Sequence, residues 1–268
     1  QNVYKKYGAV PKDLFPETES SKNTGEMNTQ LRHLLHTAVA HMYAAEGDTA
    51  KVEQIIAETT AAGHRILTIH LGEPPVSFDW EWTDADGEFH RDGEITPVEF
   101  WKKYVGPAGL EDYVCLVDDP RAEHAKGQKI GIEHLGNVAG GDATEYLNVP
   151  NQFMKDCVKQ ILVEQGIPVW FGADCHPFMD RESGAWATDL FEYGKVYDVD
   201  FDLDKEARVR FGDSAMNHAM AFAGVDVADD GTTRRWRVEN SWGAKIADKG
   251  YFTMSDDCLL YTSPSPRD

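Results

Sequence analysis

Two long segments near the start of the chain carry apolar side chains at the spacing of an amphipathic helix. Between residues 27 and 45 these side chains recur every three or four positions, and the same spacing continues from Val52 toward Leu71. Gly47 and Asp48 interrupt the pattern between the two segments. Because the connection is short, we expect two helices that lie antiparallel to each other.

A different pattern follows, in which aromatic and acidic residues alternate. Phe78, Trp80 and Trp82 are separated by acidic residues, residues 84–87 have turn composition, and Phe89 begins a return segment. Alternation with period two is typical of a strand with one buried face, so the sequence predicts a β-hairpin with an aromatic face. Such a face can stack on a sugar or a base, but packing within the protein is the commoner use.

The remaining elements mix helices and strands. Residues 96–99 form a capping box with proline at the first helical position, which predicts a helix start. The apolar run 113–117 predicts a buried strand, and residues 152–165 predict a helix that leads into a strand at 167–171. After Asp198 the pattern is mostly strand-like. The sequence therefore predicts an α+β fold.

The last hairpin of the chain brings two polar side chains together. Residues 219–227 and 233–241 have strand composition, and residues 229–231 between them have turn composition. In an antiparallel hairpin closed at this turn, His218 at one end is expected to lie opposite Asn240 at the other. Side chains alternate between the faces of a strand, so both residues are expected on one face, with Glu239 facing away.

This pairing suits a catalytic base and the group that orients it. A neutral histidine accepts a proton from a nucleophile only when its ring and tautomer are fixed, and an asparagine oxygen can fix them. Trp242 is close enough in sequence to shield that hydrogen bond, whereas Met220 and Val238 are expected in the core. Alone, each polar residue has an ordinary structural explanation; as a pair in register beside an indole they favour a function.

The segments around this pair resemble the bleomycin hydrolase and aminopeptidase C family of papain-like cysteine peptidases. The resemblance covers residues 1–257. It rests on Asn217-His218-Ala219-Met220, Trp236-Arg237-Val238-Glu239-Asn240-Ser241-Trp242-Gly243 and Lys249-Gly250-Tyr251, and upstream on Tyr7-Gly8-Ala9-Val10-Pro11-Lys12, Leu71-Gly72-Glu73-Pro74-Pro75, Ile95-Thr96-Pro97-Val98-Glu99-Phe100, Val117-Asp118-Asp119-Pro120-Arg121 and Val169-Trp170-Phe171-Gly172.

The resemblance implies a partial papain-like fold with a particular division. Residues 1–165 would form the mainly helical part with an inserted oligomerisation element, and residues 166–257 the β-rich half that carries His218 and Asn240. It further implies a cytoplasmic protein that assembles as a homohexamer and acts on peptides. Residues 258–268 resemble translated sequencing-adapter text and are expected to lie outside the fold.

The nucleophile of that family has no counterpart in this sequence. The family's cysteine is followed by tryptophan, and none of the four cysteines here is. We expect Cys115 in the buried strand, Cys157 in a helix and Cys175 in a packing or loop position. The chain also begins with Gln1, so we expect a fragment that is inactive by itself, because loss of one member of a nucleophile unit removes most of the rate.

Two functions remain for the complete protein on the basis of these residues. The first is a cysteine-type aminopeptidase that works through a Cys-His-Asn thioester mechanism, with His218 and Asn240 catalytic and Trp242 supporting. The second is a non-catalytic papain-like scaffold that has lost its nucleophile. Neither requires a cofactor or a metal. The identity of the upstream residue that takes the nucleophile's place would separate them.

Composition argues against several other classes of function. Lys and Arg number 26 against 46 Asp and Glu, a net charge of −20 that argues against nucleic-acid binding. No apolar run approaches the length of a membrane span, and the cysteines lack paired spacing, which favours a reducing compartment. A metal-dependent hydrolase is disfavoured because the ten histidines include no HExxH motif. His33 and His36 share a helix face, which is more typical of a solvated helix surface than of a metal site.

Overall fold

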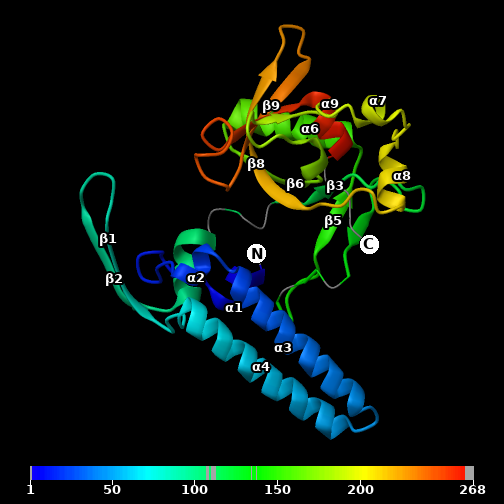
Figure 1. Cartoon of the computed structure of the whole chain (residues 1–268). Helices are drawn as coiled ribbons and strands as arrows, with labels where there is room; N and C mark the ends of the chain where they lie inside the picture. The colour runs from blue at the N-terminus through cyan, green and yellow to red at the C-terminus, as the bar shows by residue number, and fades with distance from the viewer. Residues whose placement is uncertain (1, 107–108, 110–112, 134, 137, 263–268) are drawn as a thin grey trace. The chain divides into compact units, whose positions relative to one another are not determined.

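The computed structural model describes residues 2–106, 109, 113–133, 135–136 and 138–262. The chain divides into two compact units, residues 1–111 and residues 112–268 (Figure 1). The elements of the first unit are α1 (Asn2–Tyr7), α2 (Glu19–Lys22), α3 (Gly25–Ala44), α4 (Thr49–Leu71), β1 (Phe78–Thr83), β2 (Phe89–Ile95), α5 (Pro97–Phe100) and the π-helical turn η1 (Trp101–Val105).

The longest elements of the first unit are α3 and α4, which lie side by side as a helical hairpin (Figure 1). Asp48 ends the connection between them, and its side chain accepts a hydrogen bond of 3.0 Å from the backbone N–H of Lys51. This contact satisfies one of the free N–H groups at the start of α4. The helix pair predicted from the apolar spacing is therefore confirmed.

Strands β1 and β2 form the predicted antiparallel hairpin with an aromatic face. Trp80 and Trp82 stack with their ring centroids 5.6 Å apart, and Phe100 and Tyr104 contact the Trp80 ring edge-on from α5 and η1. The aromatic face thus packs within the unit. Helix α5 begins at the predicted capping box, in which the Thr96 hydroxyl oxygen accepts from the Glu99 backbone N–H.

The second unit holds two sheets. Its elements are β3 (Leu116–Val117), β4 (Lys129–Gly131), β5 (Glu145–Asn148), α6 (Asn151–Gln160), the π-helical turn η4 (Ile161–Gln165), β6 (Val169–Ala173), the 3₁₀ turn η5 (His176–Phe178), β7 (Ala185–Trp186), α7 (Tyr193–Tyr197), α8 (Lys205–Arg210), β8 (His218–Val227), β9 (Thr233–Glu239), β10 (Tyr251–Ser255) and α9 (Asp256–Thr262). The larger sheet has the strand order β6-β8-β9-β10-β7, and the smaller one β3-β5-β4.

One face of the larger sheet forms the core of this unit. Trp236 and Val238 of β9 and Trp186 of β7 have no exposed surface, and Met220 and Phe222 of β8 are almost fully buried. Arg237, which lies between Trp236 and Val238 on β9, is exposed, as the period of two requires. The expected core positions of Met220 and Val238 are confirmed.

One expectation for this unit was wrong. The run 113–117 was expected to be a buried strand, but only Leu116 and Val117 form β3, and Cys115 is exposed. Among the described strands, β3 pairs with β5 alone, and the apolar residues at 113–115 lie outside any sheet. After Asp198 most of the regular structure is strand, as expected, in β8, β9 and β10. The region also contains α8, whose first turn is capped by a 2.8 Å hydrogen bond from Ala207 N–H to Asp204.

The expected subdomain boundary after residue 165 lies inside the second unit. Gly166 adopts the left-handed conformation that ends η4, with φ of +66°, and the chain then enters β6 in the larger sheet. Residues 258–268 were placed outside the fold by sequence reasoning. In the structure residues 258–262 belong to α9, where Cys258 and Leu259 are buried, and residues 263–268 lie outside the described residues.

A buried ion cluster joins the loop after β3 to strand β5. The Asp119 carboxylate has no exposed surface and accepts hydrogen bonds from the Arg121 guanidinium at 2.9 and 3.1 Å and from the His124 ring. Asn148 of β5 accepts from the Asp119 backbone N–H at 2.9 Å and from the Lys126 ammonium at 3.0 Å. Every buried charge in the cluster therefore has a partner of opposite charge.

Candidate active site

His218 is the first residue of β8, a strand held on both sides. It pairs with Ala173 of β6, and the preceding Asn217 donates its backbone N–H to the Ala173 carbonyl at 3.2 Å. On the other side β8 pairs with β9, whose last residue is Glu239. Strand β6 therefore fixes the backbone from which the imidazole projects, and β9 holds the same strand from Ala221 onward.

The imidazole contacts Asn240, the residue that follows β9. His218 Nε2 lies 2.9 Å from Asn240 Oδ1, and the same oxygen accepts the backbone N–H of Ser241 at 2.7 Å. A backbone N–H can only donate, so the shared atom is an acceptor and Nε2 carries the hydrogen that it donates. This contact leaves Nδ1 as the basic nitrogen of the neutral ring.

The register that joins these residues differs from the predicted one. Phe222 pairs with Val238, and a bulge follows between Phe222 and Gly224. If the same pairing is continued back to the start of β8, His218 lies opposite position 242. Asn240 is then a diagonal neighbour of His218. Diagonal neighbours on one face are still within reach of long side chains, so the contact forms although His218 and Asn240 are not directly opposite each other.

Trp242 covers the histidine ring. The two rings stack with centroids 4.8 Å apart and an angle of 23° between their planes. The indole also meets the buried Phe252 ring edge-on at 5.9 Å, and the guanidinium carbon of Arg181 lies 4.3 Å from its centroid. The His218–Asn240 hydrogen bond thus has an apolar ring beside it, which limits the access of water.

A buried network lies behind the start of β8 that sequence reasoning missed. The Asp174 carboxylate accepts from Asn217 Nδ2 at 2.6 Å and from the guanidinium of Arg208 at 2.7 Å, and Arg208 is 2% exposed. Of these residues, only Asn217 could have been singled out from the sequence, because it precedes His218 in the family motif. The sequence gives no sign that Arg208 on α8 reaches the end of β6.

The two fully buried cysteines are poorly suited to serve as the nucleophile for His218. Cys175 is fully buried, and burial raises the pKa of its thiol to about 11. Its Sγ lies 3.4 Å from the side-chain oxygen of Asn217. Burial likewise raises the pKa of Cys258 to about 12, and Cys157 lies in α6 as expected. The packing or loop position predicted for Cys175 is thus what the structure has.

The structure gives no support to a metal centre in its described part. Across residues 2–106, 109, 113–133, 135–136 and 138–262, no three His, Cys, Asp or Glu side chains gather in a way that could hold a metal ion. His33 and His36 are both exposed on α3, and His134 lies outside the described residues. Among the described helices, none has the length and apolar character of a membrane span.

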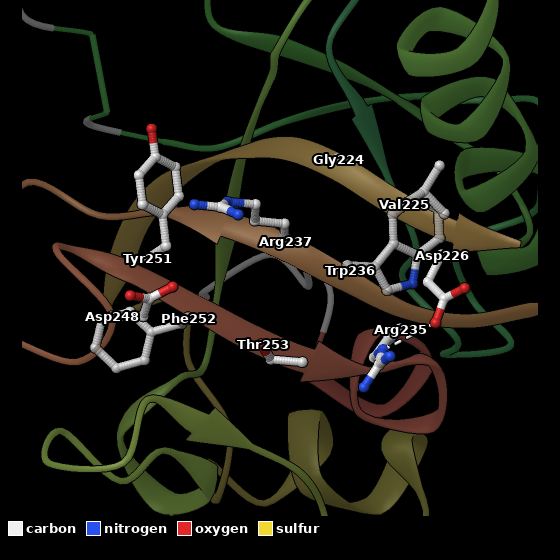
Figure 2. A pocket seen from close by; sticks show the side chains of 10 residues that line it. All are labelled: Gly224, Val225, Asp226, Arg235, Trp236, Arg237, Asp248, Tyr251, Phe252 and Thr253. Carbon is white, nitrogen blue, oxygen red and sulfur yellow. Dashed lines mark hydrogen bonds and ion pairs between the residues drawn. The ribbon is translucent and has the colours of Figure 1, made fainter.

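A separate hollow of about 340 Å³ lies on the face of the larger sheet that is turned away from the core (Figure 2). Arg237 of β9 lies over the Tyr251 ring there, with 4.0 Å between the guanidinium carbon and the ring centroid. Arg235 is held by Asp226 of β8 at 2.9 Å. The cations of this hollow are thus engaged within the protein, and neither His218 nor Asn240 lines it.

Comparison with known proteins gives consistent likenesses. The model of the Peptidase C1-like family matches residues 1–261. Aminopeptidase C of Lactobacillus delbrueckii subsp. lactis is 41% identical over 258 residues, and bleomycin hydrolase of Homo sapiens is 36% identical over 266 residues. These alignments cover 95% and 96% of this chain but only 57% and 58% of those proteins.

The crystal structure of PepW from Lactobacillus rhamnosis HN001 resembles this one with a TM-score of 0.85 at 37% sequence identity. The match covers 98% of this chain and 59% of that one. The chain therefore spans somewhat more than half the length of the relatives that it matches.

Proposed function

The chain belongs to the Peptidase C1-like family and has an α+β, papain-like fold, and from this premise we propose that the complete protein is a cysteine-type aminopeptidase. The observation that carries the proposal is the 2.9 Å contact from His218 Nε2 to Asn240 Oδ1 beneath the Trp242 ring. This contact fixes the tautomer that leaves Nδ1 free to take a proton. Relatives named aminopeptidase C and bleomycin hydrolase support peptides as the substrates.

The proposed reaction has two stages. The thiol of a cysteine supplied by sequence outside this chain loses its proton to His218 Nδ1, and the thiolate attacks the carbonyl carbon of the first peptide bond. The imidazolium then gives the proton to the leaving amine, and the C–N bond breaks to leave a thioester. A water molecule attacks the thioester with His218 as the base, and this step releases the amino acid and restores the thiol.

Because this chain spans 57–58% of the curated relatives, the proposal concerns the complete protein. The chain alone is expected to be inactive, since none of its four cysteines is followed by tryptophan as the family's nucleophile is, and two of them are fully buried. The alternative is a scaffold without a nucleophile. Sequencing the transcript upstream of Gln1 separates the two: a cysteine followed by tryptophan supports the enzyme, and serine, glycine or alanine in the cysteine's place supports the scaffold.

The hydrogen bond to Asn240 gives a direct test of the proposed roles. In the complete protein, Asn240→Ala is expected to lower kcat for an alanyl anilide by roughly ten- to a hundredfold with little change in KM, because the imidazole loses its fixed orientation. Glu239→Gln is the matched control, since Glu239 is the adjacent residue and its side chain is exposed on the other face. A larger loss from Glu239→Gln than from Asn240→Ala would contradict the assignment.

We further propose that the complete protein forms a homohexamer and that α3 contributes to the contact between copies. The support is a row of exposed apolar side chains, in which Val39 is 59% exposed and Tyr43 is 80% exposed. They line, with His36 and Ala40, a hollow of about 440 Å³ on the helix surface. Apolar rows of this kind are typical of surfaces that become covered on association.

The row of exposed apolar side chains on α3 predicts how added charge would change the assembly of the protein. The double substitution Val39→Glu and Tyr43→Glu is expected to convert the hexamer into smaller species in sedimentation velocity, because it would bury carboxylates without partners. Thr37→Glu is the control, since this residue is an exposed polar position on another side of the same helix. A double variant that sediments as the unsubstituted protein does would rule out α3 as a contact surface.

The proposed location is the cytoplasm. All four cysteines are free thiols in the structure, and two of them are fully buried. Free thiols are typical of proteins in a reducing compartment.

A further inference from the structure

Arg181 places a positive charge beside the proposed catalytic pair. Its guanidinium carbon lies 4.3 Å from the centroid of the Trp242 ring, and the same indole stacks on His218 at 4.8 Å. Taken end to end, these two distances put the guanidinium carbon no more than about 9 Å from the imidazole centroid. A residue of extended peptide spans roughly 3.5 Å, so at most two or three residues of a substrate bridge this gap.

The backbone of Arg181 is held in an ordered turn. The Asp180 carbonyl accepts from Gly184 N–H at 3.0 Å, and the Asp180 carboxylate accepts from Ser183 N–H at 2.9 Å. The Arg181 carbonyl accepts from Ala247 N–H at 3.1 Å, which ties this turn to the loop that follows Trp242. Gly184 is required there, because it has φ of +73° and a Cβ would lie 2.7 Å from that of Ala247.

The guanidinium itself is available to a ligand. Arg181 is exposed, and within the described residues its side chain forms no ion pair. Stacking on an indole occupies a face of the planar guanidinium, while its N–H groups point outward from the edge. In a chain of net charge −20, an unpaired arginine on the rim of the proposed site is suited to an anionic ligand.

The role of His218 in the proposed reaction determines which part of the substrate lies near Arg181. His218 gives its proton to the leaving amine, so the residue that leaves lies against the imidazole and the indole stacked on it. We propose that Arg181 is a specificity-determining residue that binds a carboxylate on this leaving part. The carboxylate belongs to the C-terminus of a dipeptide or to an acidic side chain close after the cleaved bond.

This inference rests on the proposed aminopeptidase function, and its test separates the two. The complete protein is assayed on alanyl-alanine and on alanyl-alaninamide, which differ only in the charge at the end of the leaving residue. We expect kcat/KM to be higher for the free acid. Arg181→Ala is expected to reduce this preference by about three- to tenfold, the usual range for one charge-assisted contact near a surface.

Further variants make the result specific to charge. Arg181→Lys is expected to retain part of the preference, and Arg181→Glu is expected to reverse it in favour of the amide. The control is Arg234→Ala, an exposed arginine paired with Asp226 near the turn end of the β8–β9 hairpin, away from His218. It is expected to leave the ratio of the two rates unchanged.

Each remaining outcome is decisive. If Arg181→Ala lowers the rates for acid and amide equally, Arg181 only holds Trp242 in place and the specificity proposal is wrong. The proposal also fails if the unsubstituted protein shows no preference for the acid. If the complete protein cleaves neither peptide nor the alanyl anilide, the proposed function itself is refuted.

Discussion

Replacing His218 with alanine is expected to lower kcat/KM of the complete protein on an alanyl anilide by roughly 10⁴-fold or more. The imidazole is the proposed acceptor of the thiol proton and the donor to the leaving amine, so both stages of the reaction lose their acid or base. Its ring is half-buried and contacts Asn240 and Trp242, which both belong to the proposed site. The variant is therefore expected to keep its fold.

Steady-state kinetics with a circular dichroism spectrum of each variant would measure this effect. The matched control is His176→Ala, because His176 is an exposed histidine of the same unit in the short turn η5. A His218→Ala protein that keeps more than a tenth of the activity would exclude His218 as the base. Equal losses from the two variants would point to damage to the unit as a whole.

The second large effect concerns stability. Asp119→Asn is expected to lower the free energy of unfolding by about 3–5 kcal/mol, because it removes the buried carboxylate that pairs with the Arg121 guanidinium. The same change weakens the bond to His124. Asp229→Asn in the exposed turn between β8 and β9 is the control and is expected to change stability by less than about 0.5 kcal/mol.

The contribution of Asp119 should depend on pH in a defined direction. Burial alone would raise the pKa of this carboxyl, but hydrogen bonds from Arg121 and His124 outweigh burial and lower the pKa to about 2 from an ordinary 3.8. A group with a lowered pKa stabilises the fold above its ordinary value and loses that contribution as the pH falls toward the lowered one.

The free energies of unfolding of the parent chain and of Asp119→Asn should therefore differ most at pH 7, and this difference should shrink as the pH falls from about 3.8 toward 2. Urea unfolding of both proteins at several pH values would measure it. A difference that stays constant down to pH 2, or that is absent at pH 7, would contradict the stabilising role of the carboxylate.

The sequence predicted the elements whose signals are local. The helix pair, the aromatic hairpin, the capping box at Thr96 and the last hairpin all follow from spacing, turn composition or capping residues within a short segment. The strand expected at 113–117 failed because apolar composition does not reveal whether a strand has neighbours on both sides. Cys115 lies just before a two-residue strand and stays exposed.

The candidate site was predicted in composition but not in its full geometry. His218, Asn240 and Trp242 were found because they belong to one hairpin and one motif. Their exact pairing was missed because the turn is centred on Asp230, where the Ala228 N–H donates to the Thr232 carbonyl, and the two irregularities farther along the hairpin cancel each other. Asp174, Arg208 and Arg181 were missed because they reach the site from other elements, and such contacts between distant segments are fixed only by the packed fold.

The local origin of the His218–Asn240 contact has a consequence for the biosynthesis of the proposed enzyme. The two residues are separated by 22 positions in one hairpin, so they can meet soon after both have left the ribosome. Folding during synthesis proceeds from the N-terminus, and a nucleophile encoded upstream would emerge long before this hairpin. The proposed thiol would then lack its base for most of translation. The order of the two halves along the gene would thus protect the nascent chain, and other new proteins, from premature cleavage.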